Sequence, residues 1–301
     1  FLPAVVFLKL PSGVSVFNEL TNIDPGLINV WGAGGATWLN VVSVVGLVSI
    51  GIGYMGSPQV YVRFIAISSE NEIKKGKWVA VFYTLITDSA AVMIGLLGRY
   101  VLTSSGQDVE IVLGVSGENV LALLLETVMP AAIIGFYIAA VLSAVMSTVD
   151  SLLVVASSAI TIDFYQQLFK QKTHEQQLII FSKKTTLVLA TLALSIALVV
   201  SLLSPNRTVF WFVIFGWSGI AATFCPAIIL SLFWDNYTEK GAIASMISGF
   251  LSVPIFKFIF TNISGLGVYF EKLDVMLPSV LVSLFCGYVV VIIDKIKHSS
   301  P

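Results

Sequence analysis

Long runs of apolar residues separated by short polar segments dominate the chain. A helix needs about 20 mostly apolar residues to cross the hydrocarbon core of a bilayer. Seven runs reach that length, and they predict membrane-spanning helices at Ala36–Met55, Trp78–Leu102, Met129–Phe164, Thr185–Leu203, Thr208–Trp234, Gly241–Phe260 and Val275–Ile293. Open sheets are excluded from lipid because their free backbone groups find no hydrogen-bond partners there. The pattern therefore predicts an all-α integral membrane protein.

Three segments depart from a simple spanning helix. Met129–Phe164 is too long for a bilayer about 30 Å thick at about 1.5 Å per residue, so we expect it to tilt or to project into the cytoplasm. Asn119–Thr127 is too short to span, and we expect a helix that lies on the surface or dips inward. Phe1–Leu10 lacks the basic segment and cleavage site of a signal peptide, so we expect the end of a helix that begins upstream.

Composition supports a membrane protein and narrows the function. Of the 301 residues, 57% are hydrophobic and 11% charged, and the mean hydropathy is +0.95, whereas soluble domains carry about 25% charged residues. The net charge of -1 gives no indication of a nucleic-acid partner. We interpret Cys225 and Cys286 as buried apolar residues, and assign no metal to His174 or His298, which fall in polar loops. No motif of a catalytic triad, phosphate loop or redox centre is present, so we do not expect an enzyme.

The basic residues predict the orientation. If Phe1–Leu10 ends on the outer side, eleven of the sixteen lysines and arginines fall inside, among them Arg63, Lys170 and Lys172, while Arg207 falls outside. Cytoplasmic loops carry such an excess of basic residues. The pattern predicts a cytoplasmic C-terminal end and a multi-pass protein of the plasma (inner) membrane.

One predicted helix carries a stripe of hydroxyl groups. In "AAVLSAVMSTVDSLLVVASSAITIDFY" (Ala139–Tyr165), a spacing of three and four places small and hydroxyl residues on one face: Ala140, Ser143, Ala144, Ser147, Thr148, Ser151 and Ser158. Close helix packing is the alternative interpretation for the small residues. Packing does not explain Asp150, because a carboxylate within the membrane is costly and usually faces a cavity, a partner or an ion.

The chemistry of the stripe suits a hard monovalent cation. Such an ion needs several oxygen ligands, which hydroxyls and backbone carbonyls supply, and one carboxylate neutralises its charge. The stripe therefore predicts part of a sodium site, with a proton on the carboxylate as the alternative. Asp88 is a second intramembrane carboxylate, which we consider a candidate for binding a proton or for contact with a neighbouring helix.

Three segments resemble the sodium:solute symporter family, most closely its sodium/proline symporters. The stripe sequence resembles the family's signature helix. "GIGYMGSPQVYVRFIAISS" (Gly51–Ser69) resembles the family pattern G-L-G-Y-F-G-Q-P-H-x-x-x-R-F. "GWSGIAATFCPAIILSLFW" (Gly216–Trp234) resembles its W-S-G-L-G-A-x-F-G-P helix. The three occur in the family's order along nearly the whole chain.

The resemblance implies a fold and an activity. The fold would be the LeuT-like inverted repeat of two five-helix halves. Residues 1–301 would be a single transporter domain forming the C-terminal part of a longer chain: 1–10 end the first repeat, 36–234 form the second, and 241–293 are peripheral helices. The activity would be sodium-coupled symport of a small organic solute, proline or another amino or carboxylic acid.

The resemblance also implies ion-binding residues. The main sodium site would use the Ala144 carbonyl and the Ser147 and Thr148 hydroxyls, together with an upstream helix. A second sodium site would use Ser147, Asp150 and Ser151. Many family members have an uncharged residue where Asp150 stands, so the second ion and its coordination stay open.

The predicted helix at Ala36–Met55 would contain part of the substrate-binding site. Its glycines and the following proline fit an interrupted helix, the feature that marks transporter binding sites, with glycine-rich packing as the alternative. The resemblance implies that substrate contacts Tyr54 and the later helix, giving the candidate set Gly51, Gly53, Tyr54, Ser57, Trp217, Ser218 and Phe224. Proline symporters have tryptophan, glutamine and histidine where Ile50, Ser57 and Gln59 stand here, so the identity of the substrate stays open.

Two other functions remain as alternatives. The chain could be the transporter-like sensor domain of a membrane signalling protein, or a proton-coupled carrier. The expected partners are a small-molecule substrate, the sodium ion and the lipid bilayer. The sequence does not define an oligomeric state.

Overall fold

The structure is a computed structural model that describes residues 1–11, 13, 15–32, 34–103, 107–168, 175–203 and 208–299. Lys170, Lys172, His174 and Arg207 lie outside the described residues, as does the side chain of His298. Seven described helices are long and apolar enough to cross a membrane: Trp38–Gly56, Glu70–Leu102, Ala131–Gln167, Glu175–Leu203, Val209–Phe233, Glu239–Asn262 and Met276–Lys297. The seven predicted spans are therefore confirmed, and the described residues contain no strand.

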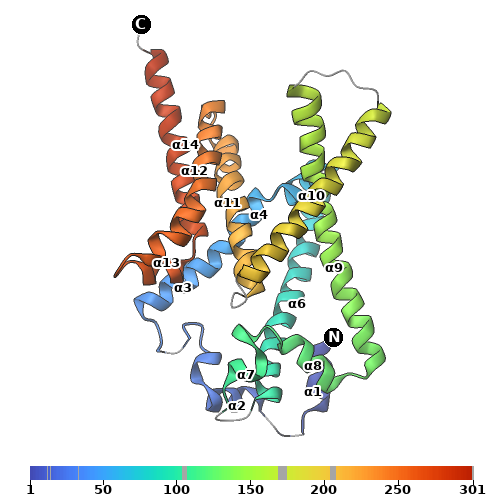
Figure 1. The fold of residues 1–301 in the computed structure, drawn as a ribbon. Helices are drawn as coiled ribbons and strands as arrows, with labels where there is room; N and C mark the ends of the chain where they lie inside the picture. The colour runs from blue at the N-terminus through green and yellow to red at the C-terminus, as the bar shows by residue number, and fades with distance from the viewer. Residues whose placement is uncertain are drawn as a thin grey trace. The chain divides into compact units, whose positions relative to one another are not determined.

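The chain forms two compact units, one made of Phe1–Leu124 with Thr208–Pro301 and the other of Leu125–Arg207. The helical elements of the first unit, coloured from blue to cyan and from orange to red in Figure 1, are α1 (Leu2–Lys9), α2 (Val16–Ile23), η1 (Pro25–Leu27), α3 (Trp38–Ser49), η2 (Ile50–Ile52), α4 (Gly53–Gly56), α5 (Pro58–Ile65), α6 (Glu70–Leu102), α7 (Val109–Leu113), η3 (Val115–Gly117), α11 (Val209–Phe233), α12 (Glu239–Phe258), η5 (Phe260–Asn262), α13 (Gly267–Leu273) and α14 (Met276–Ser299). The predicted short helix is present as α8 (Val120–Val128).

The helices α11, α12 and α14 pack together as the centre of the first unit (Figure 1). Small residues allow the close approach: a Cβ on Gly249 would lie 2.0 Å from the carbonyl oxygen of Ala222. Ser245 and Ser283 join α12 to α14 by two reciprocal bonds, in which each hydroxyl donates to the other residue's carbonyl at 3.0 and 2.7 Å. Small residues and hydroxyl bonds of this kind are how membrane helices associate without a hydrophobic driving force.

Polar caps begin several helices of the first unit. The Ser69 hydroxyl accepts a hydrogen bond from the N–H of Glu72 at the start of α6, and the Thr208 hydroxyl accepts one from Trp211 at the start of α11. The Glu118 carboxylate accepts from the N–H of Val209, so the loop before α8 is joined to the first residue of α11. Such bonds satisfy the free N–H groups of a helix start.

The second unit is a pair of long helices. The predicted long span consists of α9 (Ala131–Ser158), which begins after Pro130, and a π-helical continuation, η4 (Ala159–Leu168). It packs against α10 (Glu175–Leu203). The buried Ser157 hydroxyl lies 3.1 Å from both oxygens of Ser182 and accepts a bond from Thr186 at 2.9 Å. These contacts join the two helices near the end of α9.

Candidate functional site

The interrupted helix predicted from glycine and proline is present. Helix α3 ends at Ser49, tightens into the 3₁₀ turn η2, and continues as the single turn α4. Ser57 then has an extended backbone, with φ −75° and ψ 112°, before α5 starts at Pro58. Proline explains this break, because it lacks an N–H donor and disfavours the helical conformation of the residue before it.

Trp217 of α11 lies directly against this break. Its indole Nε1 donates a hydrogen bond to the carbonyl oxygen of Ile50 at 3.1 Å. The ring of Tyr54 meets the Trp217 ring edge-on, with centroids 4.9 Å apart. A Cβ on Gly53 would lie 2.3 Å from Trp217 Nε1, closer than real Cβ atoms approach. Gly53 is therefore required for the indole to reach its partner carbonyl.

The next turn repeats this close approach. A Cβ on Gly56 would lie 2.5 Å from the backbone nitrogen of Cys225, also on α11. The thiol of Cys225 makes a weak 3.5 Å contact to the carbonyl oxygen of Ile52. The interruption is thus held to α11 over two turns by backbone-level contacts. These contacts fix the segment before the break, from Ile50 to Gly56, against α11.

Two buried polar atoms flank Pro58 without a protein partner. Ser57 is fully buried, and neither its hydroxyl nor the Gln59 Oε1 has a hydrogen-bond partner among the described residues. Buried polar groups are nearly always paired, and exceptions in proteins often belong to functional sites. Both atoms lie directly beside the proline that breaks the helix.

The substrate candidates divide into two groups. Gly53, Tyr54 and Trp217 converge at the break, and Tyr54 remains 60% exposed. The hydroxyl of Ser218 is fully buried and donates to Ile214 within α11 at 2.7 Å. Phe224 lines a different cavity, of about 420 Å³, between α11 and α12. Gly51 is exposed with no atom near its Cβ position.

The sequence pattern missed two contributors at the break. The main-chain carbonyl of Ile50 contacts Trp217 of α11. The main-chain nitrogen of Cys225 lies against Gly56 of α4. Every residue has a backbone carbonyl, so the residue type does not reveal which carbonyl accepts a hydrogen bond. The glycines at 53 and 56 were the available signal, since a glycine within an apolar helix often marks a close approach.

The sodium candidates lie along one stretch of α9. Ala144, Ser147, Thr148 and Asp150 are exposed and Ser151 is half-buried within its unit. The Thr148 hydroxyl donates to the Ala144 carbonyl at 3.2 Å, and the Ser151 hydroxyl donates to the Ser147 carbonyl at 2.8 Å. A hydroxyl that donates to its own helix directs its lone pairs outward, where a cation can approach.

The two intramembrane carboxylates are both exposed. In the part of the chain that the structure describes, neither Asp88 on α6 nor Asp150 on α9 forms an ion pair. The same residues contain no cluster of three or more histidine, cysteine, aspartate or glutamate side chains that could hold a metal ion.

Comparison with known proteins agrees with the three sequence motifs. The family model of the sodium:solute symporter family matches residues 1–249. The osmoregulated proline transporter OpuE of Bacillus subtilis (strain 168) is 30% identical over 98% of this chain and 56% of its own length. The high-affinity proline transporter PutP of the same strain is 30% identical over 92% of this chain and 58% of its own length. The sodium/proline symporter of Staphylococcus aureus (strain Newman) is 28% identical over 96% of this chain and 54% of its own length. The chain thus spans a little over half the length of the curated relatives that it matches.

Proposed function

We propose, because the chain belongs to the sodium:solute symporter family, that the protein carries out sodium-coupled symport of proline or a similar small amino or carboxylic acid. The observation that carries the proposal is the interrupted helix held against α11 by the Trp217–Ile50 hydrogen bond and the Gly53 contact. Interrupted helices are where secondary transporters bind substrate and coupling ions, because the freed backbone groups need partners. The relatives named as proline transporters suggest the class of solute.

In this proposal the break binds the substrate. Tyr54 and Trp217 present two aromatic faces at the interruption, and these suit the apolar part of a small solute. The Ser57 hydroxyl and the Gln59 amide oxygen would pair with its polar groups, because both are buried without partners. Gly53 would act by allowing the close approach of Trp217. Gly51, Ser218 and Phe224 are the remaining substrate-binding candidates.

The stripe on α9 binds the coupling ion in this proposal. Ser147, Thr148 and the Ala144 carbonyl form this chain's part of the main sodium site, and Asp150 with Ser151 forms part of a second. Their neutral oxygens and single carboxylate match the needs of a hard monovalent cation. Sodium would supply the driving force for transport. Moving one positive charge down a membrane potential of 100 mV releases about 2.3 kcal/mol of free energy.

Coupling requires that the ion and the solute favour the same conformations. Sodium bound to the stripe raises the affinity for the solute, and by thermodynamic necessity the solute raises the affinity for sodium by the same factor. The five-plus-five repeat, with 36–234 as the second repeat and 241–293 as peripheral helices, would provide the two alternating conformations. The basic residues favour a cytoplasmic C-terminal end in the plasma membrane.

Proton coupling is the second candidate, and one observation favours it. Asp150 is an exposed carboxylate without an ion pair in the described residues, so it could carry a proton in place of a sodium ion. Sodium coupling predicts that Asp150→Asn keeps a dependence on external sodium. Proton coupling predicts that Asp150→Asn abolishes accumulation and that external sodium has no effect.

The deciding experiment is uptake of labelled proline by the full-length protein in proteoliposomes, with and without an inward sodium gradient. Sodium-driven accumulation that Ser147→Ala weakens supports the proposal. Accumulation driven equally well by a proton gradient without sodium would replace it by proton coupling. A screen of amino and carboxylic acids follows if proline is not transported, and a protein that moves none of them would contradict the transport function.

A further inference from the structure

A cavity of about 520 Å³ lies between α5 and the first turns of α6, well separated in sequence from the stripe on α9. Apolar side chains form its walls: Val60, Phe64, Ile67, Ile73, Ala80 and Val81. No atom lies within 4 Å of the position that a Cβ on Gly76 would occupy, so the cavity is open beside this glycine. Its size is in the range of sites that bind small organic molecules in proteins, about 300–1,000 Å³.

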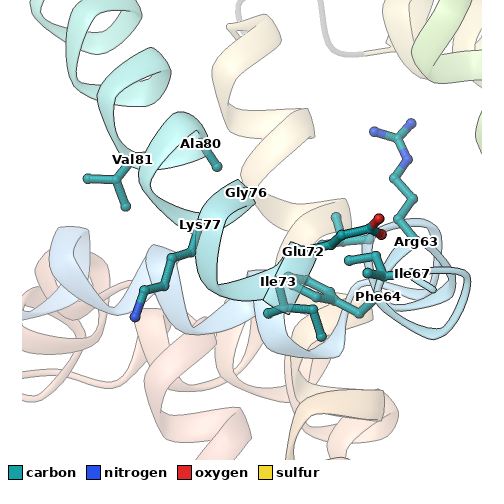
Figure 2. A pocket seen from close by; sticks show the side chains of 10 residues that line it. Arg63, Phe64, Ile67, Glu72, Ile73, Gly76, Lys77, Ala80 and Val81 are labelled. Atoms are coloured by element: carbon teal, nitrogen blue, oxygen red, sulfur yellow. The ribbon is translucent and has the colours of Figure 1, made fainter. Parts of the chain in front are cut away.

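Cations from both helices border the cavity. Arg63 extends from α5 and Lys77 from α6, on opposite sides in Figure 2. Glu72 is the acidic residue among those that line it. Neither Arg63 nor Lys77 is in an ion pair within the described residues. Residues 60–81 contain four basic and two acidic side chains and so carry a net charge of +2, whereas the whole chain carries -1.

The cavity crosses the boundary between polar and apolar parts of α6. Glu72 and Val81 are nine residues apart, which is about 14 Å along a helix. The helix is rich in charge before Lys77 and has no charged residue from Trp78 to Thr87. Lys77 Nζ lies 5.6 Å from the centroid of the Trp78 ring, which is 59% exposed. Exposed tryptophan and lysine at such a boundary mark the level of the lipid headgroups.

We propose that this cavity binds an anionic phospholipid. The acyl chain lies against the apolar walls beside Gly76, and the two cations on opposite sides of the cavity attract the anionic headgroup. A soluble phosphate would use the cations but leave the apolar walls in contact with water. A neutral lipid would fill the walls but make no use of the positive charge. Only a molecule with an anionic head and a hydrocarbon tail matches both parts of the cavity.

The test is lipid retention by the purified full-length protein, measured by native mass spectrometry after titration with dioleoyl phosphatidylglycerol or dioleoyl phosphatidylcholine. We expect the phosphatidylglycerol adduct to form at lower lipid concentration than the phosphatidylcholine adduct. Each of Arg63→Gln and Lys77→Gln lowers the affinity for phosphatidylglycerol about fivefold, the effect of one surface charge of about 1 kcal/mol. Lys75→Gln is the matched control, because Lys75 is exposed on the same turn but does not line the cavity.

A second pair of variants tests the apolar half. Gly76→Leu fills the space beside the glycine and improves helix propensity, so it blocks the acyl chain without loss of fold. Gly95→Leu on the same helix is its control, because nothing lies near its Cβ position either. We expect loss of the adduct in Gly76→Leu and none in Gly95→Leu, with both proteins monodisperse in size-exclusion chromatography.

Three results would overturn the proposal. Equal affinity for the two lipids would remove the role of the cations. Retention of the phosphatidylglycerol adduct in Gly76→Leu would remove the cavity as the site of the acyl chain. Competition by millimolar inorganic phosphate as effective as that by phosphatidylglycerol would mean that the cations bind phosphate alone. The measurement needs no transport, so its failure leaves the proposed symport activity untouched.

Discussion

The indole nitrogen of Trp217 lies 3.1 Å from the carbonyl oxygen of Ile50, a residue 167 positions earlier in the chain. The same carbonyl accepts the N–H of Gly53 in the 3₁₀ turn. The bond therefore joins α11 to the helix interruption at the one turn where α3 gives way to α4. Because this bond joins the two elements, a conformational change in the turn would displace α11, and a movement of α11 would displace the turn.

Removing the indole donor tests this link. Trp217→Phe keeps an aromatic ring beside Tyr54 but cannot donate to Ile50. We expect the KM for the transported solute to rise about fivefold, the equivalent of one net hydrogen bond. Uptake kinetics in proteoliposomes measure it. Trp234→Phe, after the end of α11, is the control and should keep the wild-type KM. An unchanged KM in Trp217→Phe would mean that the bond plays no part in substrate binding.

Adding one methyl group at the interruption tests its packing. The Cβ of Gly53→Ala would meet Trp217 Nε1 at 2.3 Å, so the ring or the turn must move. Overpacking of this kind costs about 1–3 kcal/mol, and we expect a lower melting temperature in detergent. Gly216→Ala on α11, where nothing lies within 4 Å, is the matched control and should melt no lower than the wild type, because alanine has the higher helix propensity. Equal melting of the two variants would contradict the close approach.

Loss of a hydroxyl from the stripe tests the proposed sodium site. Ser147→Ala removes one ligand oxygen, and we expect the sodium concentration for half-maximal uptake to rise roughly tenfold. The substrate KM at saturating sodium should stay close to the wild-type value. Ser195→Ala is the control, because its hydroxyl is exposed on α10 and donates to Thr191 of its own helix. A sodium dependence that is the same in both variants would exclude Ser147 as a ligand.

A charged contact outside the proposed sites is expected to matter for stability alone. Lys257 Nζ lies 3.7 Å from Asp274 Oδ1 and 5.0 Å from the centroid of the Trp211 ring. Lys257→Met should lower the free energy of unfolding by about 1 kcal/mol through loss of both contacts, while sodium-driven uptake per folded protein stays unchanged. Thermal unfolding beside the exposed Lys272→Met measures it. A shift no larger than that of Lys272→Met would show that neither contact is stabilising.

The sequence determined the seven spans because lipid enforces them. A chain in lipid must form all of its backbone hydrogen bonds internally, so a run of about 20 apolar residues forms a spanning helix. The glycines and Pro58 likewise determined the interruption, since proline constrains Ser57 whatever surrounds it. The sequence defined the boundaries less sharply. The long span begins after Pro130 and ends in the π-helical segment Ala159–Leu168, and a change of helix type has no characteristic residue pattern.

Only the tertiary structure decided which side chains meet at the interruption. Trp217, Ser218 and Phe224 are equivalent in sequence as residues of one apolar helix. In the structure Trp217 contacts Gly53 and Ile50, Ser218 is buried and bonded to Ile214, and Phe224 lines a cavity against α12. The physical reason is that helix periodicity gives the relative direction of side chains but not the partner of each face. In a membrane that partner is selected by close steric fit, because water does not distinguish an inner from an outer apolar face.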